Sequence, residues 1–264
     1  MDLQLTTKRV LVTGSTGGIG EGIVKGFARE GATVIINGRR EDEAKRVAAE
    51  IEADGGKAIV AVGDLSTDEG VADVLKRITD AVGGIDILVN NAAGGEHQND
   101  MQSPAAAWLD SYNINVLSMV RLIQKVLPEM QAQGWGRIIN ISSAAAVQPS
   151  PGMGVYSTTK AAVNNLTVNF AQSMQTDGVT INTVSPGAII TPAMVQMAQE
   201  QGIASTWEEA ETAFAGMMPA TFPFKRMGKV DEIASVVMFL ASPLASYVHG
   251  ANIRVDGGYV PTMN

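Results

Sequence analysis

Short apolar runs alternate with longer amphipathic stretches along almost the whole chain. The apolar runs are rich in Val and Ile, which is typical of strands that are buried on both faces of a parallel sheet. The longer stretches repeat apolar residues at the spacing of helices that cover such a sheet. We predict strands at residues 9–12, 33–37, 58–62, 85–90, 137–141, 180–185 and 252–255. We predict helices at residues 19–30, 40–54, 68–82, 104–133, 155–176 and 230–240.

This regular alternation predicts one α/β domain. A right-handed crossover joins each strand, through a covering helix, to the next parallel strand, so repeated units build a doubly wound sheet with helices on both faces. We therefore expect a seven-stranded, mostly parallel sheet in a single domain that spans residues 1–264. Gly31, Gly55 and Gly178 occupy positions expected of helix C-caps.

Residues 186–226 depart from this alternation. They contain Pro192, Pro219 and Pro223, and their helical stretches are short. A long segment after the carboxyl end of a strand is typical of an element that covers a ligand site, so we expect a substrate lid at residues 190–226. Its apolar side chains would either line a site for an apolar substrate or pack the lid onto the core. They are Met194, Met197, Phe214, Met217, Met218, Phe222 and Phe224.

Composition and charge exclude several classes of function. The chain has 264 residues, of which 45% are hydrophobic and 17% charged, as expected of a packed globular protein. Its formal net charge of −8 argues against a nucleic acid or an anionic membrane as the main partner. Because it has neither a long apolar run nor a signal-peptide pattern, we expect a cytoplasmic protein. With no Cys and two His, neither a metal site nor a Ser-His-Asp triad is expected.

Tyr156 and Lys160 are the first candidates for catalytic chemistry. Residues four apart lie on one face of a helix, separated by about 6 Å of rise. An ammonium beside a phenol favours the phenolate and lowers its pKa, so that the Tyr can exchange a proton with a substrate oxygen near neutral pH. A buried Tyr beside a solvated Lys on an ordinary helix would have the same spacing, so the motif depends on its context.

A glycine-rich loop supplies that context. Residues 13–20 read Thr-Gly-Ser-Thr-Gly-Gly-Ile-Gly, and they join the first predicted strand to the first predicted helix. Glycine allows close backbone approach, and the amide groups of a helix N-terminus can bind a pyrophosphate. A tight turn would also need glycine, but the position in the first βα unit favours a dinucleotide site.

The next strand ends carry residues that suit the rest of a dinucleotide. Gly38 and Arg39 follow the second strand, where NAD-binding sites place an acidic residue for the ribose 2′-OH. The Arg39 guanidinium suits a 2′-phosphate instead, although Arg39 and Arg40 could simply be solvated. Asp64 could accept a hydrogen bond from an adenine amino group, or form a turn or helix cap before Ser66 and Thr67. Small residues from Ala92 onward would let a cofactor lie against the backbone.

Together these motifs resemble the short-chain dehydrogenase/reductase family, including its 3-ketoacyl reductase-like branch. The resemblance covers nearly the whole chain, and it implies a Rossmann-type fold, a nicotinamide cofactor and a catalytic tetrad. It rests on the glycine loop, Asn90-Asn91-Ala92, Ser143, Tyr156, Lys160, Pro186-Gly187 and the closing Val255-Asp256-Gly257-Gly258.

The resemblance also implies the roles in the tetrad. Tyr156 is the acid/base, and Lys160 lowers its pKa and binds the nicotinamide ribose. Ser143 polarises the substrate oxygen, and Asn115 holds a proton-relay water. The nearby Asn113 is expected to bond its neighbours without a catalytic role, and so is Ser142, beside Ser143 at the strand end.

The expected cofactor is NADP(H). The residues expected to bind it are Gly14, Thr16, Gly18, Ile19, Gly20, Arg39, Asp64, Leu65, Asn91, Ala92, Tyr156, Lys160, Pro186, Gly187, Ile189 and Thr191. We expect NADPH to be preferred by at least about tenfold in kcat/KM, since a charge-assisted pair contributes about 1.5–3 kcal/mol. Replacing Gly38 with Asp and Arg39 with a neutral residue should reverse the preference.

Two departures from the family pattern keep other functions open. Ala93 stands where Gly is common, which resembles 2,4-dienoyl-CoA reductases, so enoyl or dienoyl thioester reduction is an alternative. No basic residue precedes Gly18, so an NAD-dependent sugar, polyol or hydroxysteroid dehydrogenase is another. A nucleotide-sensing protein without activity is a remote alternative, because it would be expected to have lost part of the tetrad.

The expected partners are a small carbonyl or alcohol substrate and further copies of the chain. Residues 130–136 and 164–179 contain no Lys or Arg, and the chain is acidic, so docking of an acidic acyl carrier protein is not expected. Predicted helices 104–133 and 155–176 are rich in Ala, Val, Met and Asn. The family pairs the corresponding helices across a two-fold axis and uses the C-terminal segment as a second interface, which implies a homotetramer.

Overall fold

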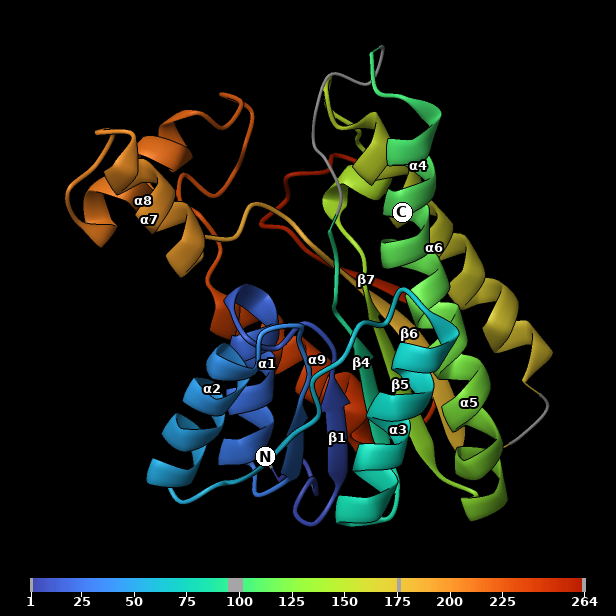
Figure 1. Cartoon of the computed structure of the whole chain (residues 1–264). Helices are drawn as coiled ribbons and strands as arrows, with labels where there is room; N and C mark the ends of the chain where they lie inside the picture. The colour runs from blue at the N-terminus through green and yellow to red at the C-terminus, as the bar shows by residue number, and fades with distance from the viewer. Residues whose placement is uncertain (1, 95–101, 175–176, 263–264) are drawn as a thin grey trace.

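A parallel sheet forms the centre of the computed structural model, which describes residues 2–94, 102–174 and 177–262 (Figure 1). The described sheet has seven strands in the order β3-β2-β1-β4-β5-β6-β7, and neighbouring strands all pair in parallel. The strands are β1 (Arg9–Val12), β2 (Thr33–Ile36), β3 (Lys57–Val60), β4 (Ile87–Asn90), β5 (Gly136–Ile141), β6 (Val179–Pro186) and β7 (Asn252–Val255). The predicted doubly wound, Rossmann-type fold is therefore confirmed.

Helices cover both faces of the sheet because successive residues of each strand point to opposite sides. Val10 and Val12 contribute to the core on one face, and Leu11 contributes to the core on the other. The first face carries α1 (Gly18–Arg29), α2 (Glu41–Ala53) and α9 (Val230–Ala241). The second face carries α3 (Asp68–Val82), α5 (Ser118–Gln133) and α6 (Gly154–Ser173). The strand order reverses between β1 and β4, and ligands of such sheets bind outside the strand ends at this point.

The helix predicted at residues 104–133 is not uniform. It consists of α4 (Ala105–Tyr112), one π-helical turn, η1 (Asn113–Leu117), and then α5. Hydrophobic spacing at this length does not distinguish a π turn from an α turn, so the sequence did not predict it. Such turns occur frequently at functional sites, and this one carries Asn115.

The segment after β6 forms a small separate layer beside the sheet (Figure 1). It contains α7 (Pro192–Glu200) and α8 (Trp207–Gly216), in agreement with the short helical stretches expected there. These helices bury apolar side chains of their own, including Val195, Ala198 and Phe214. The lid region therefore has a core distinct from the two that flank the sheet. Among the described residues, no helix has both the length and the apolar character needed to cross a bilayer.

One predicted helix cap is wrong. Gly31 and Gly55 follow α1 and α2 with positive φ, as expected, but α6 already ends at Ser173, well before Gly178. A Cβ at Gly178 would lie 2.1 Å from the carbonyl oxygen of Gly134, so glycine is required there by close backbone approach. Two single 3₁₀ turns, η2 (Ala144–Ala146) and η3 (Pro243–Ala245), complete the described elements.

Candidate active site

The glycine loop is attached to the end of β4. Gly14 has a φ of +61°, and a Cβ there would lie 2.9 Å from Cα of Ala92, so a larger residue would displace one of the two segments. The Asn91 side-chain amide donates hydrogen bonds to the carbonyl oxygens of Thr13, at 2.9 Å, and Gly14, at 3.1 Å. These bonds hold the loop against the end of β4, at the switch point of the sheet.

Helix α1 begins directly after this loop. Its N-cap, Gly17, is extended and supplies no side-chain hydrogen bond to the first turn. The backbone N–H groups of that turn are therefore available to an anion, and the helix dipole favours negative charge at the same place.

A cavity of about 790 Å³ lies along the loop and the ends of β2, β3 and β4. Seven of the residues predicted to bind a cofactor line it: Gly14, Thr16, Arg39, Asp64, Leu65, Asn91 and Ala92. Asn37, Ser66, Ile114 and Ser118 also line it and were not predicted. Asn37 directly follows β2, where position alone gave a usable signal. Ser66 lies in the turn before α3, and Ile114 is brought to the cavity by the π turn.

The remaining predicted cofactor residues lie outside the lining of this cavity. Gly18, Ile19 and Gly20 form the first turn of α1, and a Cβ at Gly20 would lie 2.4 Å from the Asn91 amide nitrogen. Gly20 is thus needed for close packing of α1 on the loop. The second group of these residues lies between the end of β6 and the start of α7: Pro186, Gly187, Ile189 and Thr191.

Arg39 and Asp64, which were predicted to bind the adenosine part of a cofactor, differ in how they are bonded to the rest of the protein. Arg39 is exposed and has no hydrogen bond or ion pair with any described residue, whereas the neighbouring Arg40 lies 3.9 Å from Glu43. The Asp64 carboxylate accepts a hydrogen bond from the backbone N–H of Ser66 at 2.9 Å. That bond, with a smaller contribution from the charge of Arg39, holds the pKa of Asp64 below its usual value. Asp64 therefore fulfils its predicted turn role and still faces the cavity.

The predicted catalytic residues Ser143, Tyr156 and Lys160 meet at the ends of β5 and α6. The Ser143 side chain hydrogen-bonds the Tyr156 phenol. Lys160 is 2% exposed, its Nζ donates to the carbonyl oxygen of Ile141 at 2.8 Å, and it lies 5.6 Å from the Tyr156 ring centroid. The hydroxyl of Ser142, next to Ser143, donates a hydrogen bond to the Lys160 carbonyl oxygen at 3.0 Å, so it bonds a neighbouring element, in line with the expectation.

The expected lowering of the Tyr156 pKa is wrong, because its net shift is upward. Burial raises the pKa of Tyr156 above its ordinary value, and the hydrogen bond with Ser143 only partly opposes this. Burial also lowers the pKa of Lys160 to about 8. The spacing of four residues correctly placed both groups on one helix face, but it could not show that desolvation dominates both titrations.

Asn115 is fixed on three sides. Its side-chain oxygen accepts a hydrogen bond from the backbone N–H of Gly94 at 2.8 Å. Its amide nitrogen donates to the hydroxyls of Ser111 and Thr159, each at 3.1 Å. Thr159 in turn donates to the Tyr156 carbonyl oxygen at 2.7 Å, so Asn115 is connected to the helix turn that carries the phenol. Sequence reasoning missed Ser111 and Thr159. Asn113, as expected, bonds its neighbours, Ser66 and Arg121.

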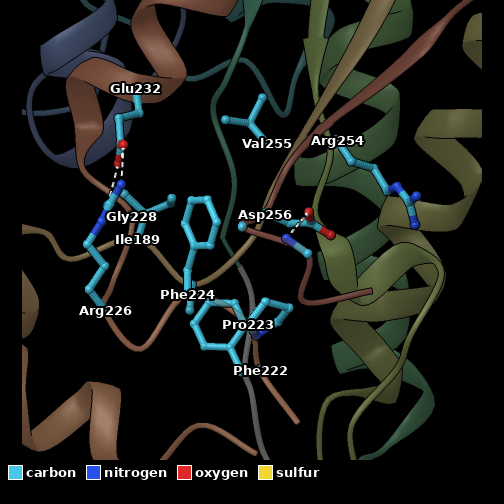
Figure 2. A pocket seen from close by; sticks show the side chains of 13 residues that line it. Ile189, Phe222, Pro223, Phe224, Arg226, Gly228, Glu232, Arg254, Val255 and Asp256 are labelled. Atoms are coloured by element: carbon cyan, nitrogen blue, oxygen red, sulfur yellow. Dashed lines mark hydrogen bonds and ion pairs between the residues drawn. The ribbon is translucent and has the colours of Figure 1, made fainter. Parts of the chain in front are cut away.

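A second cavity, of about 440 Å³, lies beyond the ends of β6 and β7 (Figure 2). Ile189, Phe222 and Phe224 give it an apolar lining. Its charged groups are already paired: Arg226 contacts Glu232 at 2.6 Å, and Asp256 accepts from the backbone N–H of Gly258 at 3.0 Å. None of its described lining residues belongs to the predicted tetrad. The predicted tetrad therefore lies outside the lining of this second cavity.

Comparisons with known proteins agree with this geometry. The family model for short chain dehydrogenases matches residues 8–202. The chain belongs to the short-chain dehydrogenase/reductase family. An oxidoreductase of Bacillus subtilis, YvaG, whose specific activity is uncharacterised, is 38% identical over 98% of both chains. As an oxidoreductase family, short-chain dehydrogenases act on small molecules with a nicotinamide cofactor.

Solved structures of the family bind different cofactors. L-sorbose reductase from Gluconobacter frateurii, complexed with NADPH and L-sorbose, is 33% identical and has a TM-score of 0.92, with complete coverage of both chains. A 7α-hydroxysteroid dehydrogenase complexed with NADH and 7-oxo glycochenodeoxycholic acid is also 33% identical, with a TM-score of 0.86 over 100% of this chain and 98% of the other. Membership of the family therefore supports a nicotinamide cofactor without deciding between the two.

Proposed function

We propose that this short-chain dehydrogenase transfers hydride between NADP(H) and the carbonyl or secondary-alcohol carbon of a small, mostly apolar substrate. The observation that carries the proposal is the grouping of Ser143, Tyr156 and Lys160. The hydroxyls of Ser143 and Tyr156 form a hydrogen bond with each other, and the buried Lys160 side chain lies beside them. They lie at the same end of the sheet as a cavity large enough for a dinucleotide. Asn115 completes the proposed catalytic tetrad.

The residues around the glycine loop fit a dinucleotide. Gly14 leaves space that a Cβ would fill, and the first turn of α1 lacks a side-chain cap. We assign the pyrophosphate to this turn, the adenosine to Arg39, Asp64 and Leu65, and the nicotinamide end to Lys160 and the segment from Pro186 to Thr191. When bound, the cofactor supplies or accepts the hydride.

In the reductive direction, the chain's own groups act on the substrate oxygen. Ser143 and Tyr156 donate hydrogen bonds to it, which stabilises negative charge as that charge develops. Tyr156 then gives its proton to the oxygen, and the buried ammonium of Lys160 stabilises the phenolate that remains. The raised pKa of Tyr156 keeps the phenol protonated before the reaction, as an acid requires. Oxidation of an alcohol runs the same steps in reverse.

Preference for NADP(H) is supported by Arg39. Its exposed guanidinium has no partner within the described residues, and it lines the cavity next to Gly38. A 2′-phosphate would supply the missing partner, whereas a free 2′-OH would find no carboxylate at Gly38. An NAD-dependent sugar or hydroxysteroid dehydrogenase is the second candidate, because a relative of similar identity is solved with NADH.

An apolar substrate is supported by the lid. Phe214 and Phe222 are buried, whereas Met197, Met217 and Phe224 remain 41%, 63% and 53% exposed. Phe214 packs in the core of this segment, Phe222 lies edge-on to the Tyr259 ring, and the other three leave apolar surface exposed. We also propose that residues 190–226 act as a lid, that an acyl carrier protein is not the substrate carrier, and that the enzyme is cytoplasmic.

A homotetramer remains our proposal for the assembly. Apolar side chains are exposed on two separate surfaces of the described chain. One, on the outer face of α4 to α6, carries Leu109, Tyr112, Leu117 and Val168; the other, near α9 and η3, carries Phe239, Leu244 and Tyr247. Two such surfaces would support two isologous interfaces, as dihedral symmetry requires.

A panel of ketones and alcohols, tested with both cofactors, examines the proposed function directly. We expect absorbance changes at the nicotinamide band with at least one free apolar ketone, and faster turnover than with a carrier-bound β-ketoacyl group. Tight NADPH binding without turnover on any carbonyl compound would instead support a nucleotide sensor.

A further inference from the structure

The backbone conformation of Gly38 does not by itself require glycine. It follows β2 at the adenosine end of the cavity, and its φ is outside the left-handed region that favours glycine. Any residue could adopt this backbone conformation. The constraint must therefore come from a neighbouring group.

That neighbour is the side chain of Thr16. A Cβ built on Gly38 would lie 2.6 Å from Thr16 Cγ2, 3.0 Å from Thr16 Oγ1 and 3.4 Å from Thr16 Cβ. The first distance is far shorter than carbon atoms tolerate, since their optimal separation is about 3.5–4.0 Å. Two of the three staggered positions on Thr16 Cβ thus face the space that a side chain at Gly38 would enter.

Rotation of Thr16 cannot clear this space. Its side chain has two heavy atoms to distribute over three staggered positions, and two of those positions face Gly38. Every rotamer therefore leaves at least one heavy atom against an added Cβ. Serine, with one heavy atom, could turn it into the third position and leave only its own Cβ, 3.4 Å away, in ordinary van der Waals contact.

The backbone on both sides is also fixed. Ser15 donates its N–H to the Asn37 carbonyl oxygen at 2.9 Å, and Asn37 donates its N–H to the Ser15 hydroxyl at 3.1 Å. These bonds join the residues immediately before Thr16 and Gly38. In addition, Arg46 donates to the Thr16 carbonyl oxygen at 3.3 Å, and its guanidinium is held by Glu21 at 2.9 Å. Moving Thr16 away would disturb both connections.

We propose that Thr16 is a specificity-determining residue that excludes an acidic side chain from position 38. This inference rests on the proposed NADP(H) function and extends it: the site lacks a carboxylate for a 2′-OH and is also built so that none can be added by a single substitution. It revises the expectation that Gly38→Asp with a neutral residue at Arg39 reverses the preference. That reversal requires Thr16 to change as well.

Variants that separate size from hydrogen bonding test the proposal. Thr16→Ser keeps the hydroxyl and frees the space, whereas Thr16→Val keeps both heavy atoms and removes the hydroxyl. Gly38→Asp alone should weaken NADH binding and lower the Tm of the cofactor-free protein. Adding Thr16→Ser should restore the Tm and tighten NADH binding by about tenfold or more, as a charged hydrogen bond to the ribose would. Adding Thr16→Val should do neither.

Gly38→Ala isolates the effect of the Cβ from that of the charge. It should lower the Tm, and Thr16→Ser should restore it while Thr16→Val does not. If Gly38→Asp is too unstable for binding measurements, these melting temperatures decide the question. Gly38→Asp that binds NADH as tightly as Gly38→Asp with Thr16→Ser, at unchanged Tm, would overturn the proposal. An equal use of NADPH and NADH by the unmodified protein would contradict only the proposed function, because the comparison among variants does not depend on it.

Discussion

The proposed catalytic end and the proposed adenosine end of the site are built in opposite ways. At the catalytic end, Asn115 and Lys160 are buried and their polar atoms bond to other parts of the protein. At the adenosine end, Arg39 is exposed and has no partner among the described residues. Groups that must hold a proton at one atom need fixed positions. A cation that selects a cofactor must instead remain available to the ligand.

The largest expected effect is a loss of turnover at the proposed catalytic end. Tyr156→Phe removes the transferable proton and keeps the ring, so we expect kcat to fall by about 10²–10⁴-fold, the usual contribution of a general acid. Cofactor affinity should remain within about twofold, because the phenol is assigned to the substrate oxygen. Steady-state kinetics and a fluorescence titration measure the two effects. Tyr247→Phe, at a fully exposed tyrosine, is the matched control. Turnover like that of the unmodified protein would refute the mechanism.

The next largest expected effect is a loss of NADPH affinity at the proposed adenosine end. Arg39→Ala should weaken NADPH binding by about tenfold or more, since charge-assisted hydrogen bonds contribute about 1.5–3 kcal/mol. NADH binding should hardly change. Arg40→Ala, at an equally exposed neighbour that lies near Glu43, provides the control. Titration of the cofactor-free protein with each nucleotide gives the affinities, and an equal loss for both variants would mean that Arg39 has no special role.

A smaller effect is expected at a residue that positions the catalytic end. Thr159→Val removes the hydroxyl that joins Asn115 to the helix turn of Tyr156, and the loss of such a hydrogen bond costs about 0.5–1.5 kcal/mol. We expect kcat to fall several-fold with KM for NADPH unchanged. Thr159→Ser should restore kcat, whereas Thr158→Val, at the exposed neighbour, should not lower it. A decrease confined to stability would assign Thr159 a structural role alone.

A further effect is one of stability. Burial lowers the pKa of Lys160 to about 8, so below that pH the folded protein carries a buried charge. Between that pH and the ordinary Lys value, the unfolded chain binds a proton that the folded chain has released, and stability rises with pH. Lys160→Met should therefore raise the Tm of the cofactor-free protein at pH 7 while removing activity.

This stabilisation should shrink as the pH rises from 8 to 10, because the unmodified protein then no longer buries the charge. Thermal melts of both proteins across this range measure the difference. A difference in Tm that stays constant with pH would show that Lys160 does not titrate there.

Local pattern predicted the sheet because strands buried on both faces need apolar residues at every position. Val34, Ile35 and Ile36 of β2 are all fully buried, and the sequence run that they form was recognised without ambiguity. The glycine loop was also predictable from local pattern, because its tight conformation requires glycine. At Gly14, the close approach of Ala92 leaves no room for a larger residue.

Features that depend on distant contacts were not predictable. Asn115 and Thr159 are separated by 44 residues, and only the fold brings them together. The pKa of Tyr156 depends on how deeply α6 packs, which residue spacing does not report. The contact between Thr16 and Gly38 likewise depends on the bonds that hold β2 against the loop. The sequence thus predicted the candidate site residues, whereas their contacts and pKa shifts depend on packing that the sequence does not report.

The cofactor ratio of the unmodified protein tests the central claim most directly. With one ketone at a saturating concentration, kcat/KM is measured for NADPH and for NADH at the same pH and ionic strength. Arg39 is exposed at the cavity, and Gly38 offers no carboxylate to a free 2′-OH. We therefore predict a ratio of at least about ten in favour of NADPH. A ratio near one, or a preference for NADH, would contradict the account, because Arg39 would then be a solvated loop residue and not the selector of the cofactor.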